Sequence, residues 1–112
     1  MTAPARDDDE LWFAVGDPSR QRVLDLLVAR GAASSTALAA DLPFTRQAVA
    51  KHLGVLERAG LVESQRRGRE VLYVVQPQRL DEATRILAGV AERWDQRLQA
   101  IKRIAEELHR GE

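Results

Sequence analysis

The 112-residue sequence contains no cysteine and few aromatic residues. Without cysteine, the chain can form neither a disulfide nor a thiolate metal site. The aromatic residues are two tryptophans, two phenylalanines and one tyrosine, although 45% of all residues are hydrophobic. The core must therefore consist mainly of Leu, Val, Ile and Ala, which suits a small helical domain. No apolar run approaches the roughly 20 residues that span a bilayer, so we expect no membrane segment.

The first ten residues are small and acidic, and they lack the basic start and apolar stretch of a signal peptide. We expect residues 1–8 to be disordered and the protein to be cytoplasmic. The acidic run at residues 7–10 is typical of a helix start, where negative charge complements the helix dipole. Cation binding by this run is the alternative interpretation.

The chain also lacks a net charge, because 17 basic and 17 acidic residues balance. This balance argues against nucleic-acid binding, for which a basic domain is usual. The charges are segregated, however: residues 45–73 contain six basic and three acidic side chains, whereas residues 7–10 are all acidic. The chain therefore offers a basic region despite its neutrality. A surface of randomly mixed charge is the alternative.

Two helices are predicted before residue 32. The first covers residues 9–15, where apolar residues cluster, and ends at Gly16. Asp17 is a good N-cap and Pro18 suits a first helical position, so a second helix begins there. Gly31 is expected to end it.

Two further helices form a helix-turn-helix pair. A serine cap and an apolar pattern predict a helix over residues 34–42, which ends at Pro43. Thr45 is expected to cap the next helix, which covers residues 45–59 and ends at Gly60.

A β-hairpin is predicted after this pair. Strand-like residues at 61–65 and 70–75 flank a turn that contains Gly68. The tip is basic on both sides of this glycine. This arrangement is typical of the wing in a winged helix-turn-helix.

The pattern from residue 79 to residue 110 predicts one long helix. An apolar residue recurs every seven positions, at Leu80, Leu87, Trp94, Ile101 and Leu108. Such a helix extends ~48 Å at 1.5 Å per residue, which is more than a small core can cover. The same helix of a second copy is the simplest cover. A ligand pocket lined by Trp94 is the alternative.

The outward side of the fourth predicted helix is the candidate DNA-reading surface. This helix must pack through Val49, Leu53 and Leu56, so its other side faces outward. Arginine can bond guanine bidentately, glutamine can do the same with adenine, and alanine lets a helix sit deep or touch a thymine methyl. Residues at a helix start are well placed for such contacts. The candidate residues are Thr45, Arg46, Gln47, Ala50 and Lys51. An ordinary solvated face is the alternative.

Further phosphate contacts are expected from arginines outside this helix. Arg66, Arg67 and Arg69 bracket the hairpin tip, which can straddle a phosphate backbone or enter a narrow minor groove. Arg20 near a helix start is a further candidate. A solubilising turn and surface decoration are the respective alternatives.

No catalytic constellation stands out. The sequence shows no Ser/His/Asp set, phosphate-binding glycine loop or pair of catalytic carboxylates, so we predict neither an enzyme nor a cofactor. We expect His52 to be packed and hydrogen-bonded, with a phosphate contact or a metal ligand as alternatives. His109 is expected to be solvated, and no metal site is predicted.

Taken together, these motifs resemble the ArsR (arsenic-repressor-like) family of bacterial winged-helix regulators over roughly residues 11–75. The run Asp17-Pro18-Ser19-Arg20 and the apolar residues after it are similar to the signature of the family's second helix. Residues 45–62 are similar to its recognition-helix signature, and Gly68-Arg69 with Tyr73 is similar to its wing. Ala37 and Ala50 depart from the family's usual glutamate and serine.

The resemblance implies a homodimeric repressor whose first and last helices form the interface. The implied interface residues are Leu11, Trp12, Leu87, Trp94, Leu98, Ile101 and Leu108. It does not imply metal sensing: the family's metal sensors place cysteines in the third helix, or His and Asp ligands in the last. Here the third helix has Ala39-Ala40, and Asp81 in the last lacks a nearby histidine. The tail is similar to the non-metal branch, in which the inducer is often unidentified.

We therefore expect a mainly α fold with a small β-hairpin, a winged helix-turn-helix in the order α-α-α-α-β-β-α. The expected parts are a disordered N-terminus (1–8), a DNA-binding core (9–76) and a dimerisation helix (77–112). The expected function is a sequence-specific DNA-binding regulator, a homodimeric repressor of an inverted-repeat operator, with an unknown small molecule as candidate inducer. The alternatives are a protein-interaction module that docks through its last helix, or a small-molecule-responsive repressor with a pocket near that helix.

Overall fold

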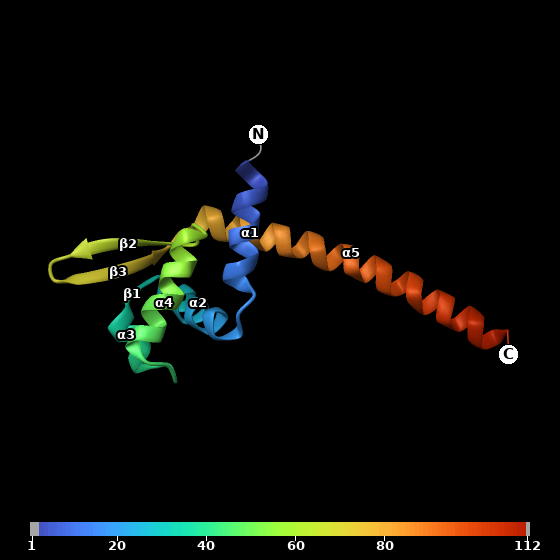
Figure 1. The fold of residues 1–112 in the computed structure, drawn as a ribbon, viewed down its shortest axis with the longest axis horizontal. Helices are drawn as coiled ribbons and strands as arrows, with labels where there is room; N and C mark the ends of the chain where they lie inside the picture. Colours follow the sequence, from blue (N-terminus) through green and yellow to red (C-terminus); the bar gives the residue numbers. More distant parts are fainter. Residues whose placement is uncertain (1–2, 112) are drawn as a thin grey trace. The chain divides into compact units, whose positions relative to one another are not determined.

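The computed structural model describes residues 3–111, and side chains from residue 8 onward. The described chain forms helices and strands in the order helix-helix-strand-helix-helix-strand-strand-helix (Figure 1). The elements are α1 (Ala3–Val15), α2 (Pro18–Arg30), β1 (Ala32–Ser34), α3 (Ser35–Ala40), α4 (Arg46–Arg58), β2 (Val62–Arg67), β3 (Glu70–Val75) and α5 (Pro77–Arg110). This is the winged helix-turn-helix with a long C-terminal helix that the sequence predicts. Two compact units meet in the sequence at Leu80 and Asp81, within α5.

Helix α1 is longer than expected. It begins at Ala3 rather than residue 9, so the helix includes residues 3–8, for which we expected disorder, while Met1 and Thr2 lie outside the described residues. Pro4 falls in the first turn, where its missing N–H is not needed. The acidic residues 7–10 lie beyond the first turn of this longer helix, so they do not form the acidic helix start that the sequence predicts.

The predicted caps of the next three helices are confirmed. The side chains of Asp17, Ser34 and Thr45 accept hydrogen bonds from backbone N–H groups three residues later. The three donor–acceptor distances are 3.1, 3.1 and 3.0 Å. Each cap satisfies an N–H that the helix itself leaves without a partner. These caps therefore fix the entry points of α2, α3 and α4.

The sheet has three antiparallel strands in the order β1-β3-β2. Strand β1 is absent from the sequence-based expectation: its residues Ala32, Ala33 and Ser34 pair with Val74, Tyr73 and Leu72 of β3. Three residues are too few to show an alternating pattern, and the pairing is distant in sequence.

The β2–β3 hairpin turns through Gly68 and Arg69. Its register pairs Arg67 with Glu70 next to the turn, and Gly68 has a φ of 62°. A positive φ at the first loop residue and not at the second is the pattern of a type II′ turn, for which glycine is favoured. The tip projects beyond the helices of its unit (Figure 1).

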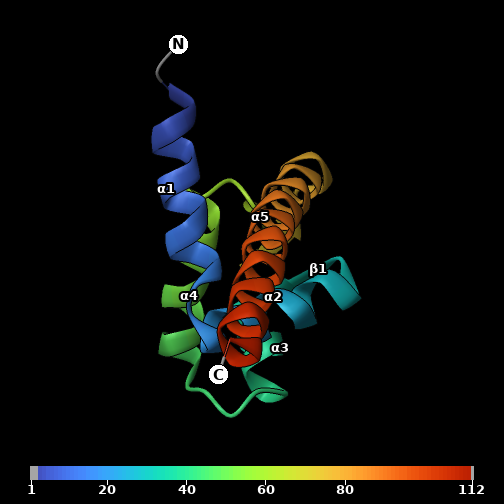
Figure 2. The same cartoon turned by 90° about the vertical axis from the view of Figure 1, so that its right-hand side faces the viewer.

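The core of the first unit is aliphatic. Helix α4 packs on α2 and α3 and buries Val49, Leu53 and Leu56. Helix α1 runs alongside α4 (Figure 2) and contributes Leu11, which is completely buried. Leu11 was expected in a dimer interface. The structure does not support that assignment, because this side chain is buried in the core of its own chain.

The part of α5 in the second unit keeps its apolar side chains in the open. Helix α5 continues without a break to Arg110. Of its residues from 81 onward, the exposed large apolar ones are Leu87, Trp94, Leu98, Ile101, Ile104 and Leu108. No helix in residues 3–111 combines the length and apolar character needed to cross a bilayer.

Candidate nucleic-acid interface

The outward face of α4 is free along its first two turns. Arg46, Gln47, Ala50 and Lys51 are all exposed, on the side of α4 away from the buried core residues. Thr45 is exposed as well and also caps the helix through its hydroxyl. None of the four polar side chains except that of Thr45 bonds to another group within residues 3–111. The face predicted to read bases is thus accessible and has unused donors.

Helix α4 is held at its start by a small aromatic cluster. The Phe44 and His52 rings meet edge to face, with centroids 6.1 Å apart. The guanidinium of Arg22 lies 5.6 Å from the centroid of Phe44. Phe44 is half-buried, so the turn between α3 and α4 is packed against α2 and α4. The start of α4 therefore has a defined position.

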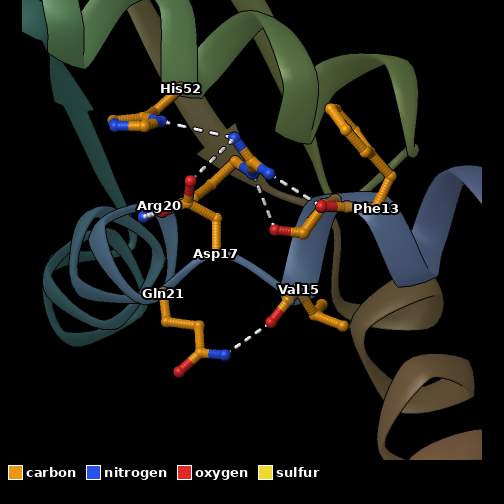
Figure 3. Close-up of polar contacts among 7 residues, drawn as sticks. Phe13, Val15, Asp17, Arg20, Gln21 and His52 are labelled. Atoms are coloured by element: carbon orange, nitrogen blue, oxygen red, sulfur yellow. Dashed lines mark hydrogen bonds and ion pairs between the residues drawn. The ribbon is translucent and has the colours of Figure 1, made fainter.

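Arg20 joins the end of α1 to α2 and α4 (Figure 3). Its Nε donates to the carbonyl of Ala14 and one terminal nitrogen donates to that of Phe13, both at 2.7 Å. The other terminal nitrogen lies 3.4 Å from Nδ1 of His52 and 4.0 Å from the Asp17 carboxylate. Since the guanidinium satisfies the carbonyl ends of one helix, it acts as a structural cap.

This position corrects the role expected of Arg20. The residue is 6% exposed, and all three guanidinium nitrogens face groups of the same chain. Its donors are therefore used mainly within the chain, which favours a structural role over a phosphate contact. His52 is half-buried and packed as expected, with Arg20 and Phe44 as its neighbours. The sequence shows Arg20 beside an N-cap, but not that the end of α1 folds back onto it.

The backbone N–H of Arg20 also sets the charge state of Asp17. This N–H donates to the Asp17 carboxylate and lowers its pKa from the ordinary value of 3.8. The N–H of Ser19 and the charges of Arg20 and His52 act in the same direction, while desolvation opposes them. A hydrogen bond to the ionised form favours that form. The cap of α2 is therefore ionised at neutral pH.

The wing presents its arginines with unequal surroundings. Arg66, Arg67 and Arg69 are exposed. Arg67 stands directly across from Glu70 in the hairpin, and this neighbour offsets part of its charge. Arg66 faces Val71 instead. The unopposed positive charge of the wing thus lies mainly at positions 66 and 69.

Comparison with known proteins agrees with this geometry. Residues 15–65 match the family described as helix-turn-helix domain. The HTH-type transcriptional regulator YuzN of Bacillus subtilis is 45% identical over 67 residues, which cover 54% of this chain and 73% of the relative. An ArsR-like transcriptional regulator from Rhodococcus sp. RHA1 has 38% sequence identity and a TM-score of 0.70, covering 93% of this chain and 97% of the other.

The chain belongs to the ArsR family of winged helix-turn-helix transcriptional regulators. This is a family of regulators and not of enzymes. A Mycobacterium bovis structure, described as a homodimeric winged helix-turn-helix DNA-binding domain, shares the fold at a TM-score of 0.67 and 23% identity, covering 80% of this chain and 83% of the other.

In the part of this ArsR chain that the structure describes, no group of three or more His, Asp or Glu side chains is placed to hold a metal ion. His109 lies near the end of α5, and in the other unit His52 packs on Phe44.

The hollow beside Trp94 is formed by α5 alone. It has a volume of about 480 Å³ and is lined by Arg93, Trp94, Gln96 and Arg97. Because these residues are close together on one helix, they line the hollow on one side only and do not enclose a ligand. A ligand site at Trp94 in this ArsR-family chain therefore stays a prediction.

Proposed function

We propose that this protein is a sequence-specific DNA-binding repressor that acts as a homodimer on an inverted-repeat operator. The observation that supports it most directly is the accessible face of α4. Its core side is sealed by Val49, Leu53 and Leu56, whereas its polar side is exposed and lacks partners of its own.

Sequence recognition is assigned to Arg46, Gln47 and Lys51. Their side chains can donate to base edges in the major groove, and Ala50 between them permits close approach. Thr45 adds a hydroxyl at the helix start. Arg66 and Arg69 of the wing, with a smaller share from Arg67, are assigned to phosphates.

The dimer is assigned to the apolar side of α5. Leu87 is 37%, Trp94 71% and Ile101 60% exposed in the single chain, and they repeat at seven-residue intervals, as in a coiled-coil seam. Exposed apolar surface of this extent is unusual for a monomer. Trp12 of α1 is 38% exposed and is assigned to the same interface. The homodimer described for the Mycobacterium bovis relative agrees with this assignment.

Two-fold symmetry then dictates the form of the operator. The two copies of α4 would enter successive major grooves, and the half-sites would lie ~34 Å apart, centre to centre, as inverted repeats. A dimer bound over a promoter would exclude the polymerase. The releasing signal is proposed to be a small molecule rather than a metal ion.

Fluorescence anisotropy with the duplex upstream of the protein's own gene tests this proposal. The dimer should bind this duplex at least ~100-fold more tightly than a scrambled duplex at physiological salt. Arg46→Ala should weaken binding to the operator by ~1–3 kcal/mol and leave binding to the scrambled duplex unchanged. Equal losses on both duplexes would contradict base reading by Arg46. If genomic mapping finds no enriched inverted repeat, the chain is an interaction module instead.

A further inference from the structure

Gly54 lies in the middle of α4 for no reason that the chain itself supplies. Glycine destabilises a helix interior relative to alanine. The positive φ values in the described chain belong to Gly31, Gly60 and Gly68, so Gly54 has a backbone conformation open to any residue. A Cβ built there would meet only one terminal nitrogen of Arg58, at 3.9 Å, which is ordinary contact. Neither strain nor crowding within the chain requires a glycine at this position.

Gly54 continues the DNA-facing side of α4. Gln47, Lys51, Gly54 and Arg58 follow at intervals of four, three and four residues, which places them on one side of a helix. Lys51 and Arg58 are exposed, and neither makes a hydrogen bond or ion pair within residues 3–111. The side that begins with base-reading candidates thus ends with a glycine and a free cation.

A hollow of about 480 Å³ lies at this glycine. Its lining includes Arg20, Lys51, His52, Gly54 and Arg58, and none of the described residues that line it is acidic. Asp9 and Glu10 line a separate hollow toward α1, which also contains Arg58. The hollow at Gly54 is therefore positively charged on the side that continues the DNA-facing surface.

The dimensions of α4 place this hollow at the edge of the groove. Thirteen residues extend ~20 Å at 1.5 Å per residue, whereas the major groove is ~12 Å wide. A helix that starts among the bases therefore passes the flanking phosphates before it ends. A backbone without a Cβ allows such a phosphate to come close.

From this geometry we infer that the hollow at Gly54 receives a DNA backbone phosphate, held by Lys51 and Arg58. The inference rests on the proposed function and extends its contact surface to the last turn of α4. Gly54 then lowers the stability of the helix but allows DNA to approach closely. Lys51 contacts both the base edges in the major groove and the phosphate at the edge of the groove.

The test is Gly54→Ala, with Gly89→Ala as matched control. Gly89 is also inside a helix, has an arginine four residues later, and a Cβ there would meet that arginine at 3.8 Å. Both variants should raise the midpoint of thermal unfolding by about 4 °C. Gly54→Ala should nevertheless weaken operator binding about tenfold, whereas Gly89→Ala should leave it unchanged. A glycine with a purely structural role cannot explain a substitution that raises thermal stability and lowers operator affinity.

A second variant tests the phosphate contact separately. Arg58→Gln should reduce the slope of log affinity against log salt by about 1.8, which is about 0.9 for each of the two copies in the dimer, on operator and scrambled duplex alike. Arg93→Gln on α5 serves as its control and should leave the slope unchanged.

Three results would overturn the inference. The first is that Gly54→Ala binds DNA as tightly as the unaltered protein does. The second is that Arg58→Gln leaves the salt slope unchanged. The third is that Gly54→Ala shifts the dimer dissociation constant, which would mean that a second copy of the chain, and not DNA, occupies the hollow at Gly54. If the unaltered protein binds operator and scrambled duplex equally well, the proposed function is wrong. This result needs no variant, so it is distinct from the three above.

Discussion

The two compact units distribute apolar side chains in opposite ways. In the unit that ends at Leu80, most aliphatic residues of α1, α2 and α4 are buried, and the described charged side chains other than Arg20 lie outside the core. In the unit that begins at Asp81, Trp94, Ile101 and Leu108 stand in the open on a single helix. The first unit thus has its own core, whereas the second acquires one only against another surface. This difference supports the proposal that the first unit contacts DNA and that the second provides most of the dimer interface.

A charge in the seam of α5 should give the largest effect. Ile101→Asp places a carboxylate in the dimer interface of both copies, and an unpaired buried charge costs ~3–5 kcal/mol. We expect the dimer dissociation constant to rise at least ~100-fold, with operator binding lost at nanomolar protein. Sedimentation velocity and anisotropy measure the two quantities.

Gln99→Asp is the matched control for this seam variant. It introduces the same charge change two residues earlier, at a position outside the seven-residue repeat, and should leave both quantities unchanged. A dimeric Ile101→Asp protein would place the interface elsewhere.

Two leucines compare the units directly. Leu53→Ala empties a fully buried site in the first unit and should cost ~2–5 kcal/mol of unfolding free energy. Leu98 is 46% exposed in the single chain, so Leu98→Ala should destabilise only the dimer. Thermal unfolding over a range of protein concentrations separates them. On dilution the deficit of Leu98→Ala should vanish and that of Leu53→Ala should persist; equal behaviour would erase the distinction between the units.

Arg20 sharpens the comparison within the first unit, because its internal bonds indicate a role in folding rather than in DNA contact. Arg20→Ala leaves the carbonyls of Phe13 and Ala14 without their donor and should cost roughly 2–3 kcal/mol of unfolding free energy. Arg20→Lys should recover part of this loss. Below the unfolding temperature, the salt slope of DNA binding should stay unchanged. A slope reduced by about 1.8, or about 0.9 per copy in the dimer, would restore Arg20 as a phosphate contact.

The smallest effect is expected from the cap of α2. The pKa of Asp17 is lowered by the N–H of Arg20, so the ionised carboxylate stabilises the fold above its ordinary pKa of 3.8. This contribution is lost as the pH falls through the lower pKa of the folded state. The unfolding midpoint of the unaltered protein should therefore fall more steeply below about pH 4 than that of Asp17→Asn. If the unfolding midpoints of the two proteins fall in parallel as the pH is lowered, Asp17 does not contribute to the loss of stability in acid.

Locally encoded features could be predicted from the sequence. The starts of α2 and α4 follow from Asp17 and Thr45, because an N-cap bonds to its own first turn. The exposed face of α4 follows from the spacing of its apolar residues.

Features that depend on distant contacts could not be predicted. The short strand β1 exists through its pairing with β3, and Leu11 and Arg20 are buried because α1 packs beside α2 and α4. An arginine near a helix start has the same sequence signature whether its partner is a phosphate or the end of a neighbouring helix. The sequence alone does not single out Gly54, because a glycine without a structural reason can be recognised only when its surroundings are known.

The wing is anchored at two points of the helix-turn-helix. Ser34 both pairs with Leu72 of the wing and caps α3, while Ser64 of the wing bonds to Glu57 of α4. On the proposed function, wing and recognition helix would therefore meet DNA with a fixed spacing between them. One base pair inserted between the wing contact and the groove contact would rotate one of them by about 35° around the duplex relative to the other, and the bonds that join the wing to α3 and α4 oppose such an adjustment.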